Sequence, residues 1–364
     1  MARLKGYAAK FCLLLASCCV ALLLLEGGVR VFFPYARDHV LPGRLFDIDD
    51  YLGWKLKAEK QVIHRSRYFN VVYATNSLGF RDKLRHRSKN KEIYRVLLYG
   101  DSQVFGWGVP EDRRFSNLLE AHMPSLELWN LAIPAYGLDQ QILSYEREGA
   151  SLNADEVIFF VSEETLRRTH RDYMDGRYKP MFVKSQHGLL QVAPPKQVVT
   201  PRLLYEVLSP LYLPHFVNRR LKMLHALVEG GSNKRGPEAD RDTITSSART
   251  GNFEEEILNI ARDIAVKRKH KIRVLAELPY AMRKVLQEFC SRKGIGFLAI
   301  DFDNVSGSLV LGRDDHHWNL QAHQLVAEQM LSQVDWNIPR GRAGKYLLRH
   351  RFGFDPNVHP EPVL

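Results

Sequence analysis

The sequence predicts an α/β fold built on a parallel sheet of about five strands. Short apolar runs alternate with helical patterns from residue 94 to residue 334. The helical patterns are long enough to serve as the crossover connections that parallel strands require. The apolar runs show almost no polar alternation, which is typical of strands covered on both faces. Together these observations favour one α/β domain.

The strands and helices of this domain can be placed from the same pattern. We expect strands at 94–99, 126–132, 155–161, 272–278 and 295–301. We expect helices around 114–122, 138–149, 254–270, 281–294 and 322–334. The helix over 281–294 ends at a glycine, as helices often do. The preceding residues 46–93 are more polar, with short strands predicted at 61–64 and 70–74.

One long segment interrupts the alternation after the third strand. Residues 162–250 contain no clear strand–helix unit. Within them, 203–228 is apolar and aromatic, whereas 229–252 is rich in Gly, Ser and charged residues and is predicted to be a flexible loop. Such insertions often form lids or binding loops. The sequence equally favours the alternative that the insertion is a helical subdomain that only packs on the sheet.

The amino terminus carries a predicted membrane anchor. An uncharged apolar run from Phe11 to Leu25 follows Arg3, Lys5 and Lys10. A span needs roughly 20 apolar residues, which the run supplies from Gly6 onward if the Lys10 side chain reaches the interface. Positive charge is denser before the run than after it, which favours a cytoplasmic amino terminus. We therefore expect an uncleaved single-pass signal anchor in the lipid bilayer.

Two alternatives to that anchor remain open. A cleaved signal peptide would require a small-residue cleavage site, and no convincing one follows the run. The stretch from Leu15 to Cys18 resembles a lipoprotein box, so lipidation at Cys18 is the second alternative.

These patterns divide the chain into four parts. Residues 1–34 form the cytoplasmic tip and transmembrane anchor, and 35–93 form an amino-terminal extension that packs on the domain. Residues 94–335 form the α/β domain, including the insertion at 162–252, and 336–364 form a basic carboxy-terminal tail.

Charge and cysteine content limit the possible partners. The chain has 364 residues and a formal net charge of +11, which favours anionic partners such as acidic polysaccharides or lipid head groups. No zinc spacing or basic–aromatic repeat points to nucleic acid, so we expect none as a partner. Of the four cysteines only Cys290 lies outside the apolar run, which excludes a disulfide framework and a cysteine-based metal site.

A candidate active site begins at Gly100-Asp101-Ser102, directly after the strand at 94–99. In an open parallel sheet, ligands bind outside the carboxyl ends of the strands. Ser102 is therefore a candidate nucleophile, although a serine there also suits the N-cap of the next helix.

The second candidate segment is RDDHHWNLQAH, residues 313–323. An imidazole that takes the serine proton and a carboxylate that orients it would complete a hydrolytic triad. We expect His317 as general base, with Asp315 or Asp314 as its partner. A metal site of Asp314, Asp315, His316 and His317 is less favoured, because four adjacent residues cannot all converge on one ion without a loop.

The two segments together resemble the SGNH/GDSL hydrolase superfamily, particularly its membrane-anchored bacterial members linked to surface polysaccharides. The resemblance covers about residues 48–333. Its matching parts are Gly100–Ser102 with Gly106, Gly108 and Val109, then Asp315–Asn319 with His323, Asn130–Gln140, and the upstream stretch Asn76–Asp82.

The resemblance implies a flavodoxin-like three-layer sandwich, an ester-cleaving serine, no cofactor and no metal. It further implies a serine esterase or O-acyltransferase that acts on acyl, chiefly acetyl, esters of an extracytoplasmic glycan. The expected location is the periplasmic side of the inner membrane, with envelope-polysaccharide assembly proteins as possible partners.

The expected oxyanion site departs from the family pattern. The resemblance implies backbone N–H donors from Ser102 and from Ala135 or Gly137, but Ala132 and Ala135 stand where the family usually has glycine. Glu163 stands where the family has an asparagine donor, and it can donate only if burial raises its pKa well above roughly 4.3.

Two alternatives to a protonated Glu163 stay open. A neighbouring side chain can take over the donor role; the candidates are Ser162, Thr165, Arg167 and Arg168. Otherwise the domain is catalytically silent and acts as a glycan-binding or scaffold protein at the membrane.

Overall fold

The computed structural model describes residues 2–34, 36, 45–174, 177–185, 188–196, 210–228, 253–303, 305–334 and 336. The chain divides into two compact units, Met1–Ala74 with His170–Gly251 and Thr75–Thr169 with Asn252–Leu364. The chain passes from one unit to the other after residues 74, 169 and 251, whereas the sequence places boundaries at 93, 162 and 252. The predicted flexible loop at 229–252 and the tail from 337 lie outside the described residues.

The second unit contains the predicted parallel sheet of five strands. They are β5 (Tyr94–Tyr99), β6 (Leu126–Asn130), β7 (Glu156–Ser162), β12 (Lys271–Glu277) and β13 (Gly296–Ala299). Their order is β13-β12-β7-β5-β6, and every neighbouring pair is parallel. Since β5 lies between β6 and β7, the chain order reverses beside β5. The sheet is therefore flavodoxin-like and doubly wound, which confirms the predicted fold class.

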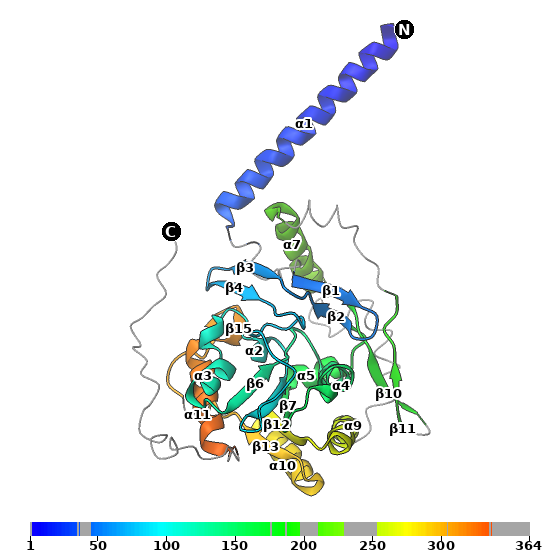
Figure 1. The fold of residues 1–364 in the computed structure, drawn as a ribbon. Helices are drawn as coiled ribbons and strands as arrows, with labels where there is room; N and C mark the ends of the chain where they lie inside the picture. Colours follow the sequence, from blue (N-terminus) through cyan, green and yellow to red (C-terminus); the bar gives the residue numbers. More distant parts are fainter. Residues whose placement is uncertain are drawn as a thin grey trace. The chain divides into compact units, whose positions relative to one another are not determined.

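Helices cover both faces of this sheet. Helices α3 (Phe115–His122) and α11 (Leu320–Gln333) lie together on one face, and α4 (Leu138–Arg147), α9 (Phe253–Arg268) and α10 (Tyr280–Lys293) on the other (Figure 1). Two short helices, α2 (Ser102–Phe105) and α5 (Glu163–Thr169), follow the carboxyl ends of β5 and β7. Short 3-10 turns lie at Glu111–Arg113 and Gly149–Ser151, and the hairpin β14 (Val310–Gly312) and β15 (Asp315–Trp318) precedes α11.

The sequence pattern explains these elements. All seven residues of β7 are buried, as expected for a central strand covered on both faces. In α9 the buried residues Ile257, Leu258, Ala261 and Ala265 recur at helical spacing. Burying one large apolar side chain stabilises the fold by about 1.5–3 kcal/mol. Gly294, with φ of +68°, ends α10 in the left-handed conformation.

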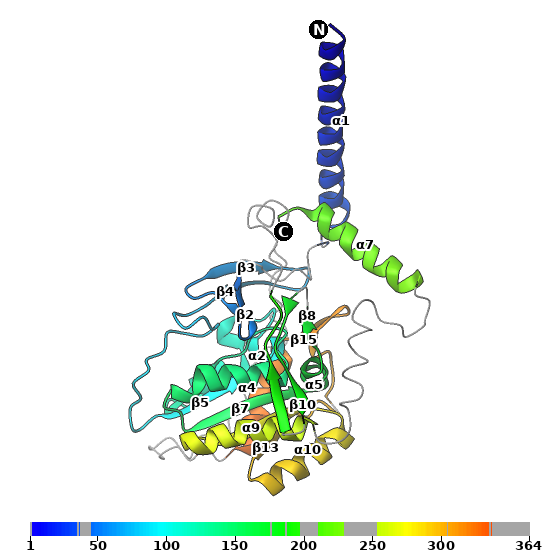
Figure 2. The same ribbon diagram turned by 90° about the vertical axis from the view of Figure 1, so that its right-hand side faces the viewer.

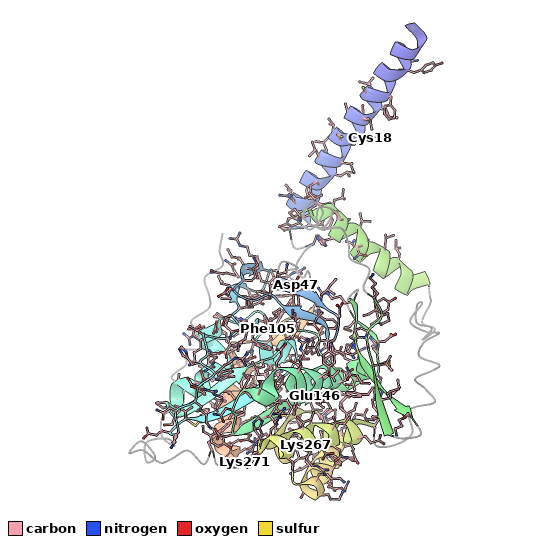
Figure 3. The ribbon with its side chains drawn as sticks, turned by 45° about the vertical axis from the view of Figure 1, so that its right-hand side comes forward. Cys18, Asp47, Phe105, Glu146, Lys267 and Lys271 are labelled. Carbon is pink, nitrogen blue, oxygen red and sulfur yellow. The ribbon has the colours of Figure 1, made fainter. Side chains whose placement is uncertain are left out.

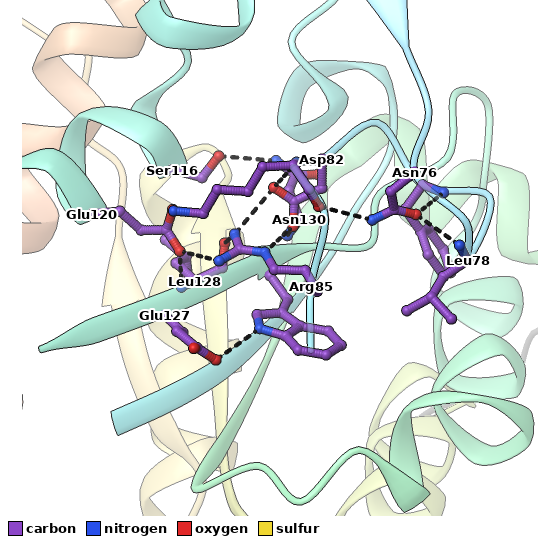
Figure 4. Close-up of polar contacts among 12 residues, drawn as sticks. Asn76, Leu78, Asp82, Arg85, Ser116, Glu120, Glu127, Leu128 and Asn130 are labelled. Carbon is purple, nitrogen blue, oxygen red and sulfur yellow. Dashed lines mark hydrogen bonds and ion pairs between the residues drawn. The ribbon is translucent and has the colours of Figure 1, made fainter. Parts of the chain in front are cut away.

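A buried polar network fixes the chain before β5 to strand β6 (Figure 4). Arg85 donates to Asp82 Oδ2 at 2.7 Å, to Glu120 Oε1 at 2.7 Å and to the Leu128 carbonyl at 3.0 Å. Asp82 Oδ2 in turn accepts from the Asn130 backbone N–H at 3.2 Å. Removing one partner of such a buried pair is strongly destabilising. The network holds the motif-bearing segment 76–82 next to the strand that leads into the candidate site.

In its described residues, the first unit consists of antiparallel hairpins and two helices. The hairpins are β1 (Phe46–Asp49) with β2 (Gly53–Leu56), β3 (Gln61–Arg65) with β4 (Asn70–Ala74), β8 (Tyr173–Met174) with β9 (Arg177–Tyr178), and β10 (Met181–Ser185) with β11 (Gly188–Val192). The helices are α1 (Ala2–Phe32) and α7 (Tyr212–Val228). Strands β3 and β4 match the strands expected at 61–64 and 70–74. The hairpins within the insertion are not predicted by the sequence, because antiparallel pairs without intervening helices do not follow the strand–helix alternation on which the prediction rests.

Helix α1 is long and apolar enough to cross a membrane over Lys10–Phe32, by length and composition alone. The side chains within this stretch, including Cys18 near the middle of the helix, are largely exposed (Figure 3). The stretch continues beyond Leu25, where the predicted apolar run ends. It includes Glu26 and Arg30, whose side chains pair at 2.7 Å.

Candidate active site

The turn after β5 presents Ser102 at the carboxyl edge of the sheet. Asp101 is the N-cap of α2, because its Oδ1 accepts from the Gln103 backbone N–H at 2.9 Å. Ser102 is the first residue of the helix, so the alternative that Ser102 itself provides the cap is wrong. The Ser102 hydroxyl is therefore not used in capping and can bond to a side chain from another part of the chain.

That side chain is His317 on β15. Its Nε2 lies 2.9 Å from Ser102 Oγ, and its Nδ1 lies 2.7 Å from Asp315 Oδ1. Asp315 is buried, whereas Asp314 is exposed in the turn between β14 and β15. Of the two candidate carboxylates, the structure therefore brings Asp315 to the imidazole. An ionised Asp315 only accepts hydrogen bonds, so Nδ1 carries the proton and Nε2 is free to accept from Ser102.

Gln103 and Trp107 hold the His317 ring in this position. The Gln103 side chain accepts from the Trp318 backbone N–H at 2.8 Å and donates to the His316 carbonyl at 3.3 Å. It thus binds β15 on both sides of His317. The Trp107 ring stacks on the imidazole, with ring centroids 5.0 Å apart. Sequence reasoning missed both residues, because neither belongs to a triad pattern.

Arg81 binds the loop that follows Ser102, residues 105–109. Its guanidinium donates to the carbonyls of Phe105 at 2.9 Å, Gly106 at 2.6 Å and Val109 at 2.6 Å. Gly106 has φ of +79°, and a Cβ there would overlap the Arg114 side chain. The upstream stretch 76–82 thus has a structural role at the site, because it supplies the arginine that fixes this loop.

The backbone N–H groups of Ser102 and Ala135 remain candidate donors to the oxyanion. Among the described residues, neither Ser102 nor Ala135 has a hydrogen-bond acceptor for its backbone N–H. Ala135 is buried and has φ of +67°. Residues other than glycine rarely adopt this left-handed conformation, which costs on the order of 1–2 kcal/mol and is concentrated at functional sites. Ala135 therefore reproduces the conformation that glycine would adopt more easily.

The backbone N–H of Gly137, unlike that of Ala135, already has an acceptor. That group donates to Gln140 Oε1 at 3.2 Å in the first turn of α4. The expectation that Gly137 is an oxyanion donor therefore conflicts with its role in capping the helix. Ala132, the other alanine at a candidate glycine place, donates to Asn130 Oδ1 at 3.3 Å.

The segment after β7 also differs from the expectation. Ser162 and Thr165 bond to each other, through Ser162 N–H to Thr165 Oγ1 at 2.8 Å and Thr165 N–H to Ser162 Oγ at 3.2 Å. Glu163 is the first residue of α5, and its side chain is exposed. The structure therefore lacks the burial on which the role of Glu163 as an oxyanion donor depends. A side chain at the start of a surface helix points to water rather than into the sheet edge.

Arg168, one turn further along α5, is the buried cation of this region. Its Nη1 donates to Asp101 Oδ2 at 2.8 Å and to the Tyr136 carbonyl at 3.5 Å, and its Nε donates to Glu164 Oε1 at 3.0 Å. Arg168 thus connects the nucleophile turn to the loop that carries Ala135. The sequence indicated it only as one of four substitutes for the missing asparagine.

Two further titratable side chains lie nearby. Glu277, at the end of β12, pairs in register with Ser162 and accepts from the Trp318 indole at 3.2 Å. Burial, with a contribution from the charge of Asp101, raises the pKa of Glu277 to about 7. Burial, with the charges of Arg114 and Arg81, lowers the pKa of His323 to about 3. His323 Nδ1 accepts from the Phe115 N–H at 3.3 Å, so His323 is a packed neutral residue of α11.

Within the described ranges, no group of three or more His, Cys, Asp or Glu side chains is placed to hold a metal ion. Residues 314–317 do not converge on one point. Asp315 turns to His317, whereas Asp314 and His316 are exposed.

Comparison with known proteins finds no matching family model and no matching curated protein. Solved structures do match. A protein from Desulfitobacterium hafniense DCB-2 assigned to the lipolytic G-D-S-L family is 13% identical, with 66% of this chain and 99% of that chain covered and a TM-score of 0.37. A member of the same family from Veillonella parvula DSM 2008 is 12% identical, with 66% and 97% covered and a TM-score of 0.34.

A two-domain esterase active on acetylated mannans is 11% identical to this chain, with 67% of this chain and 49% of the esterase covered and a TM-score of 0.35. Two of these three structures thus carry the family description that the sequence motifs resemble. The geometry of the site itself, rather than this likeness, supports a function.

Proposed function

We propose that this protein is a serine esterase or O-acyltransferase of the SGNH/GDSL type. The observation that carries the proposal is the continuous chain of contacts from Ser102 Oγ through His317 to Asp315, at 2.9 and 2.7 Å. These distances lie within the reach expected of a nucleophile, its base and the group that orients the base. Asp315, rather than Asp314, is the orienting carboxylate.

In the acylation step, Ser102 Oγ attacks the carbonyl carbon of the ester and its proton passes to His317 Nε2. The buried carboxylate of Asp315 stabilises the imidazolium that forms. When the tetrahedral intermediate collapses, the C–O bond to the alcohol breaks and His317 returns the proton to the leaving oxygen. The product is an acyl-serine at residue 102.

The negative charge of the intermediate is assigned to the backbone N–H groups of Ser102 and Ala135. Both lack another acceptor among the residues that the structure describes. Each donor of this kind contributes about 2.7–4 kcal/mol to transition-state stabilisation. Arg168 acts as a positioning residue, because it holds both the turn before Ser102 and the Tyr136 carbonyl next to Ala135.

Deacylation distinguishes the two activities. Attack by water releases an acid, whereas attack by an acceptor hydroxyl transfers the acyl group, and both use the same acyl-enzyme. The proposed substrate is an O-acylated, chiefly O-acetylated, glycan outside the cytoplasm, reached from an inner-membrane anchor. The net charge of +11 would attract an anionic polymer of this kind.

The proposal is tested by labelling the purified protein with a fluorophosphonate probe. Wild type is expected to react at Ser102 and to hydrolyse a small aryl acetate. Ser102→Ala should lose both properties while keeping its circular dichroism spectrum. Full turnover in Ser102→Ala would remove the nucleophile assignment. If folded wild-type protein neither reacts with the probe nor hydrolyses the aryl acetate, the alternative of a catalytically silent glycan-binding or scaffold protein is favoured. The motive for this alternative is that Glu163, at the place of the family's asparagine donor, is exposed.

A further inference from the structure

Helix α7 in the insertion carries an exposed stripe of apolar side chains. Val217, Leu221 and Leu224 recur at the i, i+4, i+7 spacing of one helix face, and they are 44%, 59% and 55% exposed. Asn218, which is also exposed, lies about 90° around the helix from the centre of this stripe. The seventeen residues of α7 include three arginines or lysines, at 219, 220 and 222, but no acidic residue. A long helix with an exposed apolar stripe and only positive charges is typical of helices that lie at a membrane surface.

The start of α7 is fixed to the end of α1. The Glu26 carboxylate accepts from the backbone N–H groups of Tyr212 at 2.9 Å and Leu213 at 2.8 Å. The first N–H groups of a helix have no partner within the helix, so Glu26 supplies the acceptors that α7 needs. Arg30 also bonds to Glu26, at 2.7 Å.

Aromatic contacts complete this junction. The rings of Phe33 and Phe216 lie 4.6 Å apart between centroids, and the Arg220 guanidinium stands 5.1 Å from the centre of the Phe216 ring. Figure 2 shows α7 leaving the end of α1 and running away from it instead of returning along it. The two helices therefore share one rigid corner.

The position of that corner follows from the length of α1. The apolar stretch Lys10–Phe32 has 23 residues and is about 34 Å long, slightly more than the roughly 30 Å of a bilayer core. If it spans the bilayer, its carboxyl end lies at the head groups. The beginning of α7 then lies within about 9 Å of the head groups, because its backbone bonds to Glu26, six residues before Phe32, and Phe216 contacts Phe33.

We propose that α7 lies in the head-group layer of the same bilayer, with Val217, Leu221 and Leu224 directed to the acyl chains. Arg220, which is exposed beside the stripe, meets anionic head groups. The lipid surface is favoured over a protein partner because the exposed face is continuous with the membrane span and the helix carries only positive charge. The proposal rests on the membrane span of α1 and is independent of the hydrolase activity.

Spin-label accessibility in proteoliposomes of phosphatidylethanolamine and phosphatidylglycerol tests the proposal. Full-length protein with its native cysteines replaced receives one label, at Leu224→Cys or at the matched control Asn218→Cys. In lipid, the Leu224→Cys label should be accessible to oxygen and shielded from a water-soluble nickel chelate. The ratio of oxygen to nickel accessibility should be at least about threefold higher at Leu224→Cys than at Asn218→Cys.

Two results would overturn the placement of α7. Equal nickel accessibility at both labels would put the helix in water. Shielding of the Leu224→Cys label from both reagents would mean that protein, from this chain or a second copy, covers the face. The circular dichroism spectrum of each variant checks the fold without relying on hydrolase activity.

A third variant that keeps only Cys18 separates the placement of α7 from the span on which it rests. If a label at Cys18 is not in the lipid core, the span itself fails. If Cys18 is in the core and Leu224→Cys is in water, only the placement of α7 fails.

Discussion

The two sides of the candidate site are built in different ways. On the nucleophile side, the proposed catalytic groups are side chains, and Ser102, His317 and Asp315 lie in sequence of contact at 2.9 and 2.7 Å. On the oxyanion side, the family-typical glycine and asparagine are replaced, Gly137 caps a helix, and Glu163 is exposed. Yet this side keeps, at Ala135, a backbone N–H with no acceptor among the described residues.

The difference shows which residues the chemistry constrains. A triad needs three particular functional groups, so its residues cannot be substituted by other types without loss of the chemistry. An oxyanion donor can be a main-chain N–H, which almost any residue supplies if the backbone adopts the required conformation. Here that conformation is kept by a strained alanine and by Arg168, which bonds to both Asp101 and the Tyr136 carbonyl. Four predictions test this contrast.

The largest effect should distinguish the two aspartates of the nucleophile side. Asp315→Asn cannot hold His317 in the reactive tautomer, so kcat for an aryl acetate should fall about 10²–10⁴-fold. Asp314→Asn, in the exposed turn, should stay within about twofold of wild type, the scale of an ordinary surface change. Steady-state kinetics of both variants measure the contrast. Similar mild losses in both would argue against any triad.

The next effect tests whether Arg168 positions the oxyanion side. Arg168→Met leaves Asp101 buried without its cation, which should lower the free energy of unfolding by roughly 3 kcal/mol and reduce kcat about 10–100-fold. KM should change little, since the residue acts on the turn and the loop and not on the substrate. Arg168→Lys should restore part of kcat. Compared with Arg168→Met, the double variant Asp101→Asn/Arg168→Met should recover more of the free energy of unfolding than of kcat. A double variant that recovers full activity would show that Arg168 only neutralises Asp101.

A moderate, pH-dependent effect is expected for Glu277, which lies between the two sides. Its pKa is raised to about 7 in the folded protein, so the folded state binds the proton more tightly than the unfolded chain does. The contribution of Glu277 to stability is therefore largest below its ordinary pKa of 4.5 and is lost as pH rises to about 7. Glu277→Gln should remove this loss and stabilise the protein at pH 8, relative to pH 5, by about 1–3 kcal/mol.

Thermal denaturation of wild type and Glu277→Gln between pH 5 and pH 8 measures this effect. The Gln side chain keeps an oxygen that can accept from the Trp318 indole, so the hydrogen bond is not the variable. A difference in melting temperature that is the same at every pH would contradict the assignment of the titration to Glu277.

The smallest effect should come from Glu163. Because its side chain is exposed at the start of α5, Glu163→Gln should change kcat by less than about threefold and leave the alkaline side of the pH–rate profile unchanged. The experiment is a pH–rate profile of both proteins. A tenfold loss, or an alkaline fall in wild type that the variant lacks, would return Glu163 to the oxyanion site.

The α/β fold could be predicted because its signals are local. The apolar runs that became β5, β6, β7, β12 and β13 are largely buried, and the helices between them show a readable helical period. Ser102, His317 and an aspartate at 314 or 315 could be proposed for the same reason, since the serine follows a strand and the acidic and histidine residues are adjacent in the sequence. The hairpins of the insertion could not, because their short antiparallel strands are not separated by helices and so do not follow the strand–helix alternation.

The sequence by itself thus determined the layered sheet, the candidate catalytic side chains and the apolar amino-terminal helix, all of which depend on residue type and short-range spacing. Tertiary structure alone decided what depends on approach between distant segments. It placed Asp315, and not Asp314, against His317, and turned Glu163 to solvent while burying Arg168 against Asp101. It also joined Glu26 to the start of α7 across 186 residues of chain. Such contacts arise from backbone geometry and burial, which no single stretch of sequence encodes.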